Sequence, residues 1–285
     1  MARGGERWLA TAEVALLFAL VVALAWLMRR WEGINLWQAR TLGYPVLPQL
    51  LLLVLLPGLA GALMGRGFRV PGVSLSRPMP QLDLGLTSLL IFGPAYGVAF
   101  PIIILLGSSP QALLGSLILC VTYAISAPLL WLLLRVYSPQ PPLAGSARAL
   151  LLVVGVMLAS AGVMALAWRF TPLAGAVLYP LAFVGIGEEV FFRGYVQGRL
   201  NEIWGRPWCL GKVSFGPGLL AAALLFGLAH PLVAADPSRW AWALWTFAAG
   251  LLLGYLRELS GGVLAPIIAH GVPEVVPYVI GSIYS

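Results

Sequence analysis

The chain alternates between long apolar stretches and short polar connections from one end to the other. A helix that crosses a lipid bilayer needs about 20 mostly apolar residues, and the apolar stretches approach that length. The pattern therefore predicts an all-α, polytopic bundle with eight or nine membrane helices. The expected spans cover approximately residues 12–28, 46–64, 84–106, 112–134, 149–167, 174–204, 217–235, 240–256 and 263–283.

Two polar connections suggest how the chain is organised. Residues 65–82 contain several prolines and three arginines, and residues 135–148 contain three prolines within four positions. Proline-rich segments of this kind are typical of linkers between helices. We expect residues 1–148 to form N-terminal membrane helices without a recognised motif, and residues 149–285 to form a second, C-terminal membrane core.

Composition supports a protein built for lipid. Hydrophobic residues make up 60% of the chain and charged residues only 9%, whereas soluble domains have roughly 25% charged residues. The net charge of +7 comes from basic residues that stand singly or in pairs between apolar runs. This distribution suits contact with anionic lipid head groups, and no nucleic-acid partner is expected.

The basic residues also indicate an orientation, because cytoplasmic loops of membrane proteins are enriched in Lys and Arg. With nine spans and a cytoplasmic N-terminus, the cytoplasmic side carries Arg3, Arg7, Arg66, Arg69, Arg77, Arg135, Arg148, Arg199, Arg206, Lys212 and Arg257. The other side carries Arg29, Arg30, Arg40, Arg169 and Arg239. We expect a multi-pass protein of the bacterial cytoplasmic membrane with its N-terminus in the cytoplasm.

Most of the acidic residues stand where water or head groups can reach them. A solvated role is expected at helix ends and in loops for Glu6, Glu32, Asp83, Glu202, Asp236 and Glu258. Glu13, near the start of the first span, is expected to extend toward the membrane interface. The remaining acids, Glu188, Glu189 and Glu274, occupy apolar positions, as do both histidines of the chain, His230 and His270. Ionisable residues inside a span are costly and indicate function.

Helical spacing suggests how these groups pair. Glu189 and Arg193 are four residues apart and lie on one helix face, whereas Glu188 points about 100° away. Arg193 is therefore expected to hold Glu189 while Glu188 faces another partner, the alternative being a purely structural ion pair between helices. Glu274 follows His270 by one turn and could orient its imidazole ring.

Two chemistries fit such a cluster. Glu188, His230 and His270 could be ligands of a divalent metal such as zinc, which would activate water. Alternatively, without a metal, Glu188 could activate water while the histidines stabilise an oxyanion. The cofactor is therefore either absent or a divalent metal, and the residues leave this open. Phe192 and Phe226 stand beside the polar positions and are candidates for substrate contacts.

The motifs resemble those of one known family. Glu188-Glu189-x-x-x-Arg193, then Phe226-x-x-x-His230, then His270 at the end of SGGVLAPIIAH, together with FFRGYVQGRL, resemble the CPBP superfamily of CAAX prenyl proteases and bacteriocin-processing (Abi) membrane enzymes. The resemblance covers about residues 175–280. It implies an all-helical intramembrane endopeptidase.

The resemblance also implies individual roles. The first glutamate of the pair, Glu188, would activate water, and Glu189 and Arg193 would shape the site. His230 and His270 correspond to the motif histidines. Four residues after the last histidine the family usually has Asn, where this chain has Glu274. An ionised Glu can only accept hydrogen bonds, whereas Asn can also donate them. Glu274 is therefore expected to be protonated, to orient His270 or to bind a cation.

The predicted function is cleavage of a membrane-associated protein or peptide, either in bacteriocin-like maturation or in removal of a C-terminal sorting tag. A second hypothesis is a non-catalytic membrane scaffold, or an ion- or proton-coupled transporter that uses the same buried polar groups. A third is a metal-dependent hydrolase acting on a lipid-linked substrate.

Overall fold

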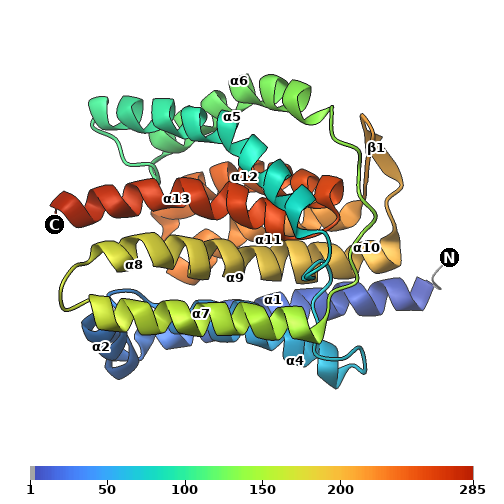
Figure 1. The fold of residues 1–285 in the computed structure, drawn as a ribbon, viewed down its shortest axis with the longest axis horizontal. Coiled ribbons are helices and arrows are strands. Elements are labelled where there is room, and N and C mark those ends of the chain that lie inside the picture. The colour runs from blue at the N-terminus through green and yellow to red at the C-terminus, as the bar shows by residue number, and fades with distance from the viewer. Residues whose placement is uncertain (1–3, 285) are drawn as a thin grey trace.

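The computed structural model describes residues 4–284 and forms a bundle of long helices that lie side by side, with the N- and C-terminal ends at opposite ends of the bundle (Figure 1). Residues 1–3, which include Arg3 of the charge argument, and residue 285 lie outside the described range. In chain order the elements are α1 Gly4–Arg30, α2 Glu32–Thr41, α3 Val46–Pro48, η1 Gln49–Leu55, α4 Leu56–Leu63, α5 Pro78–Leu105, α6 Leu113–Leu134, α7 Ala147–Ala167, α8 Leu173–Leu178, η2 Tyr179–Gly185, α9 Ile186–Glu189, η3 Val190–Gln197, α10 Gly198–Trp204, β1 Trp208–Leu210, β2 Val213–Phe215, α11 Pro217–Ala234, η4 Pro237–Arg239, α12 Trp240–Ser260 and α13 Leu264–Tyr284.

The all-α membrane bundle expected from the sequence is confirmed. Within the described residues, 7 helical stretches are long and apolar enough to cross a membrane, and a shorter apolar helix covers Leu264–Val279. The 7 stretches correspond to the first seven expected spans, and α12 and α13 occupy the positions of the last two. Large apolar side chains on the outside, such as Leu105 (84% exposed) and Leu166 (76% exposed), suit a surface that faces lipid.

Local structure departs from the expected pattern in three places. The first helix begins at Gly4 and not near residue 12, and the short helix α2 follows it. A two-stranded antiparallel hairpin joins α10 to α11, with Leu210 opposite Val213. Its two-residue turn is possible because Gly211 has a positive φ of 61°. These polar connections carry no long apolar run, so hydropathy alone does not reveal their structure.

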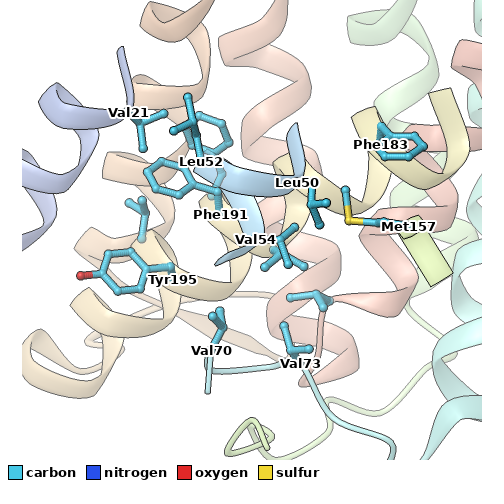
Figure 2. Packing of buried hydrophobic residues seen from close by; sticks show 14 of the residues in the cluster. Val21, Leu50, Leu52, Val54, Val70, Val73, Met157, Phe183, Phe191 and Tyr195 are labelled. Carbon is cyan, nitrogen blue, oxygen red and sulfur yellow. The ribbon is translucent and has the colours of Figure 1, made fainter. Parts of the chain in front are cut away.

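The interior of the bundle combines both halves of the chain. One buried cluster includes Val21 of α1, Leu52 of η1, Met157 of α7 and Phe191 of η3 (Figure 2). The proposed division at residue 148 stays a prediction, but the N-terminal helices pack directly against the helix that carries the glutamate pair. They therefore contribute to the walls of any site formed there.

Small residues let the helices approach closely around that helix. A Cβ added at Gly185, at the end of η2, would lie 2.8 Å from the Cα of Gly271 in α13. A Cβ at Gly250 of α12 would lie 3.0 Å from the Cα of Ala223 in α11. Because lipid is as apolar as the side chains, close backbone packing replaces the hydrophobic effect as the force that joins membrane helices.

Candidate active site

The glutamate pair stands in the middle of one long helical stretch. Glu188 and Glu189 form the end of α9, between the π-helical segments η2 and η3. Departures from α-helical geometry inside a helix are frequent at functional sites. Glu189 is fully buried, whereas the side chain of Glu188 keeps 15% of its surface exposed. The two neighbours therefore meet different surroundings.

Glu189 is held between two positively polarised groups. Its Oε1 accepts a hydrogen bond of 2.8 Å from Nη1 of Arg193 and one of 2.8 Å from Nδ1 of His270. The pairing with Arg193 confirms the expectation from helical spacing. Arg193 also donates from Nη2 to the carbonyl oxygen of Gly250 at 3.3 Å, so the guanidinium group joins η3 to α12.

Glu188 faces the other side of the His270 ring. Its Oε2 lies 3.9 Å from Nε2 of His270. Because Nδ1 of His270 contacts a carboxylate, which can only accept, this nitrogen carries the hydrogen. Nε2 is thus the nitrogen of His270 that faces Glu188 and is free to exchange a proton there.

His230 is fixed in a similar way by a backbone group. Its Nδ1 lies 2.9 Å from the carbonyl oxygen of Phe226, one turn earlier on α11. A carbonyl oxygen only accepts, so Nδ1 carries the hydrogen and Nε2, on the opposite side of the ring, is the free nitrogen. A neutral His230 in this tautomer accepts hydrogen bonds at Nε2 and does not donate them.

Phe226 brings these groups together. Its ring makes edge contacts with His230 at 5.1 Å and with His270 at 5.7 Å between centroids, and the guanidinium carbon of Arg193 lies 4.3 Å from the ring centroid. Phe192 contacts it edge-on at 5.1 Å. Phe192 and Phe226 are 3% and 2% exposed. Phe226 therefore orients both imidazole rings, and substrate contact by these two residues stays a prediction.

Glu274 occupies a neighbouring part of the site. Its Oε1 accepts a hydrogen bond of 3.3 Å from the hydroxyl of Tyr96 in α5. The sequence suggested that Glu274 orients His270, but Glu189 makes that hydrogen bond in the structure. Tyr96 was not expected at the site, because nothing in its local sequence distinguishes it from other aromatic residues of a membrane helix.

Two cavities meet at Glu188. The larger, of about 630 Å³, is lined by Glu188, His230, His270 and Glu274 and extends to the loops around Gly43, Pro110, Trp168 and Pro172. The smaller, of about 200 Å³, is mainly apolar and is lined by helices α1, η1 and α11. Both cavities share Gln49, Glu188 and His230 as lining residues. No local feature of the sequence indicated Gln49, which the fold brings in from the N-terminal half.

The two histidines of the site share one feature with metal ligands. The free Nε2 atoms resemble those of metal-binding histidines, whose other nitrogen donates to a carboxylate or carbonyl group. However, among residues 4–284 no three His, Cys, Asp or Glu side chains lie together in a way that could hold a metal ion. The arrangement therefore does not fit a protein-bound catalytic metal, and no step below depends on one.

Two acids expected to be solvated are buried instead. Glu13 of α1 is held by Arg66, Arg199 and Tyr195, and its side chain is only 8% exposed. Its partners come from α10, η3 and the connection after α4, so the local sequence could not reveal them. The expectation that Glu13 extends to the interface was wrong.

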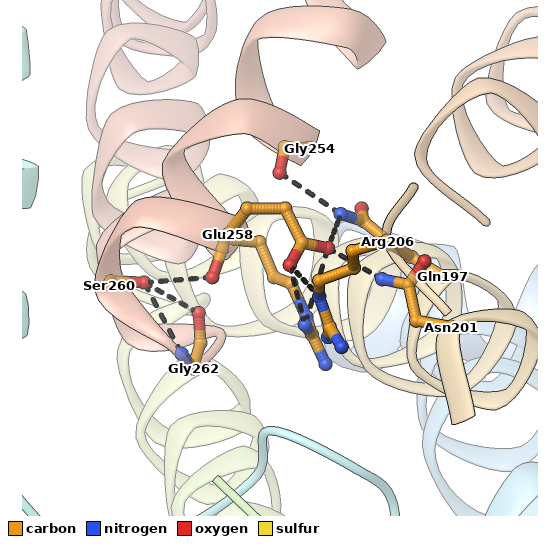
Figure 3. A network of polar contacts seen from close by, with 8 residues as sticks. Gln197, Asn201, Arg206, Gly254, Glu258, Ser260 and Gly262 are labelled. Carbon is orange, nitrogen blue, oxygen red and sulfur yellow. Dashed lines mark hydrogen bonds and ion pairs between the residues drawn. The ribbon is translucent and has the colours of Figure 1, made fainter. Parts of the chain in front are cut away.

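Glu258, at the end of α12, is 2% exposed in its side chain and accepts hydrogen bonds from Gln197 at 2.7 Å, from Arg206 at 2.6 Å and from Asn201 (Figure 3). The prediction of a solvated Glu258 was likewise wrong. Asp236, by contrast, is exposed in a loop, where hydrogen bonds from the hydroxyl and backbone N–H of Ser238 lower the pKa of its carboxyl group.

The fold and this site define a multi-pass, all-helical membrane protein with a buried Glu–Arg–His centre beside a cavity. Residues 170–276 match the family model of the Rce1-like type II CAAX prenyl endopeptidases. This match confirms the resemblance to the CPBP superfamily and supports a protease of the CAAX type acting within the membrane. Comparison with curated proteins and with solved structures gives no match.

Proposed function

We propose that this protein is an intramembrane endopeptidase in which Glu188 activates the water that cleaves a peptide bond. The proposal rests on the different surroundings of two adjacent carboxylates. Glu189 is fully buried and hydrogen-bonded to Arg193 and His270, whereas Glu188 lines the cavities and lies beside His270. A carboxylate that reaches solvent inside a fixed polar frame suits a general base.

The first step uses Glu188 and His230. Glu188 takes a proton from water as the water oxygen attacks the carbonyl carbon of the substrate. The free Nε2 of His230 accepts the second hydrogen of that water and fixes its direction. Both groups line the same two cavities, and the proposal places one water molecule between them. The product is a tetrahedral intermediate with a negatively charged oxygen.

The second step uses His270. In its protonated form His270 donates from Nε2 to the developing oxyanion, and the hydrogen bond of 2.8 Å to Glu189 balances the charge of the ring. Glu188 then passes its proton to the nitrogen of the leaving amine, and the C–N bond breaks. One water is consumed, and the products are a carboxylic acid and an amine.

The substrate is a membrane-associated protein or peptide. A site inside a bundle of membrane helices is reached from the bilayer or from the loops at one end of the cavity. The smaller, apolar cavity adjoining Glu188 suits an apolar side chain next to the bond that is cut. Maturation of a bacteriocin-like peptide and removal of a C-terminal sorting tag both present such a segment.

The test compares membrane proteins of cells that make the wild-type protein with cells that make Glu188→Gln, His230→Ala or His270→Ala. We expect mass spectrometry to show a substrate at its shorter, cut mass only with the wild type, because each variant removes a group that takes part in proton transfer or charge stabilisation. Losses of roughly 100-fold or more are typical of such groups.

Glu32→Gln, an isosteric change at an exposed position of α2, is the matched control and should leave the cut product unchanged. Membrane fractions must contain every variant at wild-type levels. Full cleavage by Glu188→Gln would contradict the assignment. A proton or ion flux that depends on Glu188, without any cut product, would instead support a transporter.

A further inference from the structure

The larger cavity combines acidic and aromatic groups, and its lining residues in the described part of the chain include no Lys or Arg. Glu188 and Glu274 are its carboxylates, and its walls include the aromatic residues Tyr44, Trp242 and Tyr278. Faces of aromatic rings attract cations, and recognition of ammonium groups by such walls is a common arrangement. The cavity is therefore suited to a positively charged group.

One helix aligns these groups in a row. His270, Glu274 and Tyr278 are spaced four residues apart on α13, and all three line the cavity. Each interval of four residues advances about 6 Å along a helix. Glu274 is thus about 6 Å further along the cavity than His270, whose Nε2 lies 3.9 Å from Glu188.

Within the part of the chain that the structure describes, no Lys or Arg forms an ion pair with Glu274. Its one hydrogen bond comes from the neutral hydroxyl of Tyr96 at 3.3 Å. Arg193, the buried arginine of the site, donates its hydrogen bonds to Glu189 and to the carbonyl oxygen of Gly250. The basic groups that line the cavity are His230 and His270, and His270 is already hydrogen-bonded to Glu189. The other titratable groups of the lining are Glu188 and tyrosines, which carry no positive charge.

A carboxylate that is partly shielded from water and has no Lys or Arg partner is unfavourable. A cation that enters the cavity would relieve this cost through charge-assisted hydrogen bonds and contacts with the aromatic walls. A protein-bound metal ion fits poorly, because no group of three His, Cys, Asp or Glu side chains in residues 4–284 is arranged so that it could hold one. A cationic group of the substrate fits both the carboxylate and the aromatic rings.

We propose that Glu274 is a specificity-determining residue that binds the ammonium or guanidinium group of a Lys or Arg side chain in the substrate. This inference rests on the proposed function, since it places a peptide in the cavity. An extended peptide advances about 3.3 Å per residue, so the distance of about 6 Å from His270 to Glu274 along α13 corresponds to two residues. The enzyme therefore selects peptides with a basic residue about two positions from the bond that is cut.

The test measures binding separately from cleavage. Full-length protein carrying Glu188→Gln, which holds peptides without cutting them, is placed in lipid nanodiscs. Three dye-labelled apolar peptides, identical except for Lys, norleucine or Glu at one central position, are titrated by fluorescence anisotropy. We expect the Lys peptide to bind roughly tenfold tighter than the norleucine peptide, the effect of one charge-assisted hydrogen bond.

Adding Glu274→Gln should abolish the preference for Lys, and adding Glu274→Lys should transfer it to the Glu peptide. Glu32→Gln in the same background is the matched control and should keep the preference for Lys. Thermal unfolding of each variant confirms that it is folded. Equal binding of the Lys and norleucine peptides, or a preference for Lys that survives Glu274→Gln, would overturn the proposal.

Cleavage by the protein with native Glu188 gives the position of the basic residue. Mass spectrometry of the products should show the cut two residues from Lys, and a cut that does not follow Lys when Lys is moved contradicts the assignment. The two proposals can fail separately. Selective binding without any cleavage contradicts the peptidase and keeps the cation site, whereas cleavage that depends on Glu188 without selectivity for Lys contradicts only the cation site.

Discussion

Arg193 is the residue on which the geometry of the candidate site depends most. Its guanidinium group contacts Glu189, the carbonyl oxygen of Gly250 and the face of Phe226, and it is fully buried. The planar fork of Arg can make these contacts at the same time. A Lys side chain is a single point charge on a flexible stem and cannot.

We therefore expect Arg193→Lys to lower kcat by roughly 10- to 100-fold although the charge is retained, because Glu189 then no longer fixes His270. Peptide cleavage by purified protein measures this effect. Arg148→Lys, at an exposed position near the start of α7, is the matched control. Wild-type kcat in Arg193→Lys would show that charge alone is sufficient at this position.

At the scale of elements, the site exists because α13 lies directly against the helix that carries Glu188. Gly185 and Gly271 make this contact possible, since each side chain is a single hydrogen atom. His270 directly precedes Gly271, and Gly185 stands three residues before Glu188. Any increase in the spacing of the two helices therefore changes the distance between His270 and the two glutamates.

We expect Gly185→Ala to lower kcat by roughly tenfold or more, because the added Cβ would lie 2.8 Å from the Cα of Gly271 and α13 must move away. Gly162→Ala in α7 is the matched control, since a Cβ there has nothing within 4 Å. Comparison of kcat and of the unfolding temperature separates displacement of the site from general destabilisation. Equal kcat values for the two variants would contradict this account.

The hydrogen-bond network around Glu258 stabilises the opposite end of the helices. It joins the end of α12 to η3 and α10 through Gln197, Asn201 and Arg206 (Figure 3). Glu258, Gln197, Asn201 and Arg206 are not among the residues that line the two cavities described above. We assign the network to stability and not to chemistry.

Glu258→Ala leaves Arg206 without its buried partner, and we expect it to reduce the free energy of unfolding by roughly 3 kcal/mol, as is typical of broken buried ion pairs. Denaturant titration of the protein in detergent measures the loss. The folded fraction should retain its kcat. This value is the cleavage rate divided by the concentration of active sites, which active-site titration gives. A large fall in kcat at full folding would show that the network also positions the catalytic groups.

At the scale of the whole molecule, the larger cavity reaches one end of the bundle. The loops around Gly43, Pro110 and Trp168 that line it join helices at the end opposite the N-terminus, where the C-terminal end also lies (Figure 1). If the N-terminus is cytoplasmic, as the distribution of Lys and Arg predicts, this end of the cavity faces the outside of the cell. Substrates would then enter from the outer side of the membrane.

Cys209 is a natural reporter of this orientation. It is exposed in β1, at the same end of the bundle as the N-terminus (Figure 1). In intact cells we expect a membrane-impermeant maleimide to leave Cys209 unmodified and to label it after permeabilisation. Ser108→Cys in a Cys209→Ser background, in the loop between α5 and α6, should react without permeabilisation. The opposite pattern would mean that the N-terminus is outside.

Much of this protein could be predicted from its sequence because apolar length and buried charge are local properties. Runs of about 20 apolar residues specify membrane helices whatever their neighbours are, so all nine expected spans have helical counterparts. The pairing of Glu189 with Arg193 follows from the helical period alone. Ionisable residues in apolar segments also indicated where the candidate site would lie, since such residues are costly inside a span.

Only the tertiary structure decided which groups meet. In the structure His270 is hydrogen-bonded to Glu189, and Glu274 is hydrogen-bonded to Tyr96, a residue 178 positions away in the chain. It buried Glu13 and Glu258 among partners that no local pattern reveals. Membrane helices pack through shape and hydrogen bonds and not through hydrophobicity, so their neighbours are specified by contacts between distant segments, which hydropathy along the chain does not record.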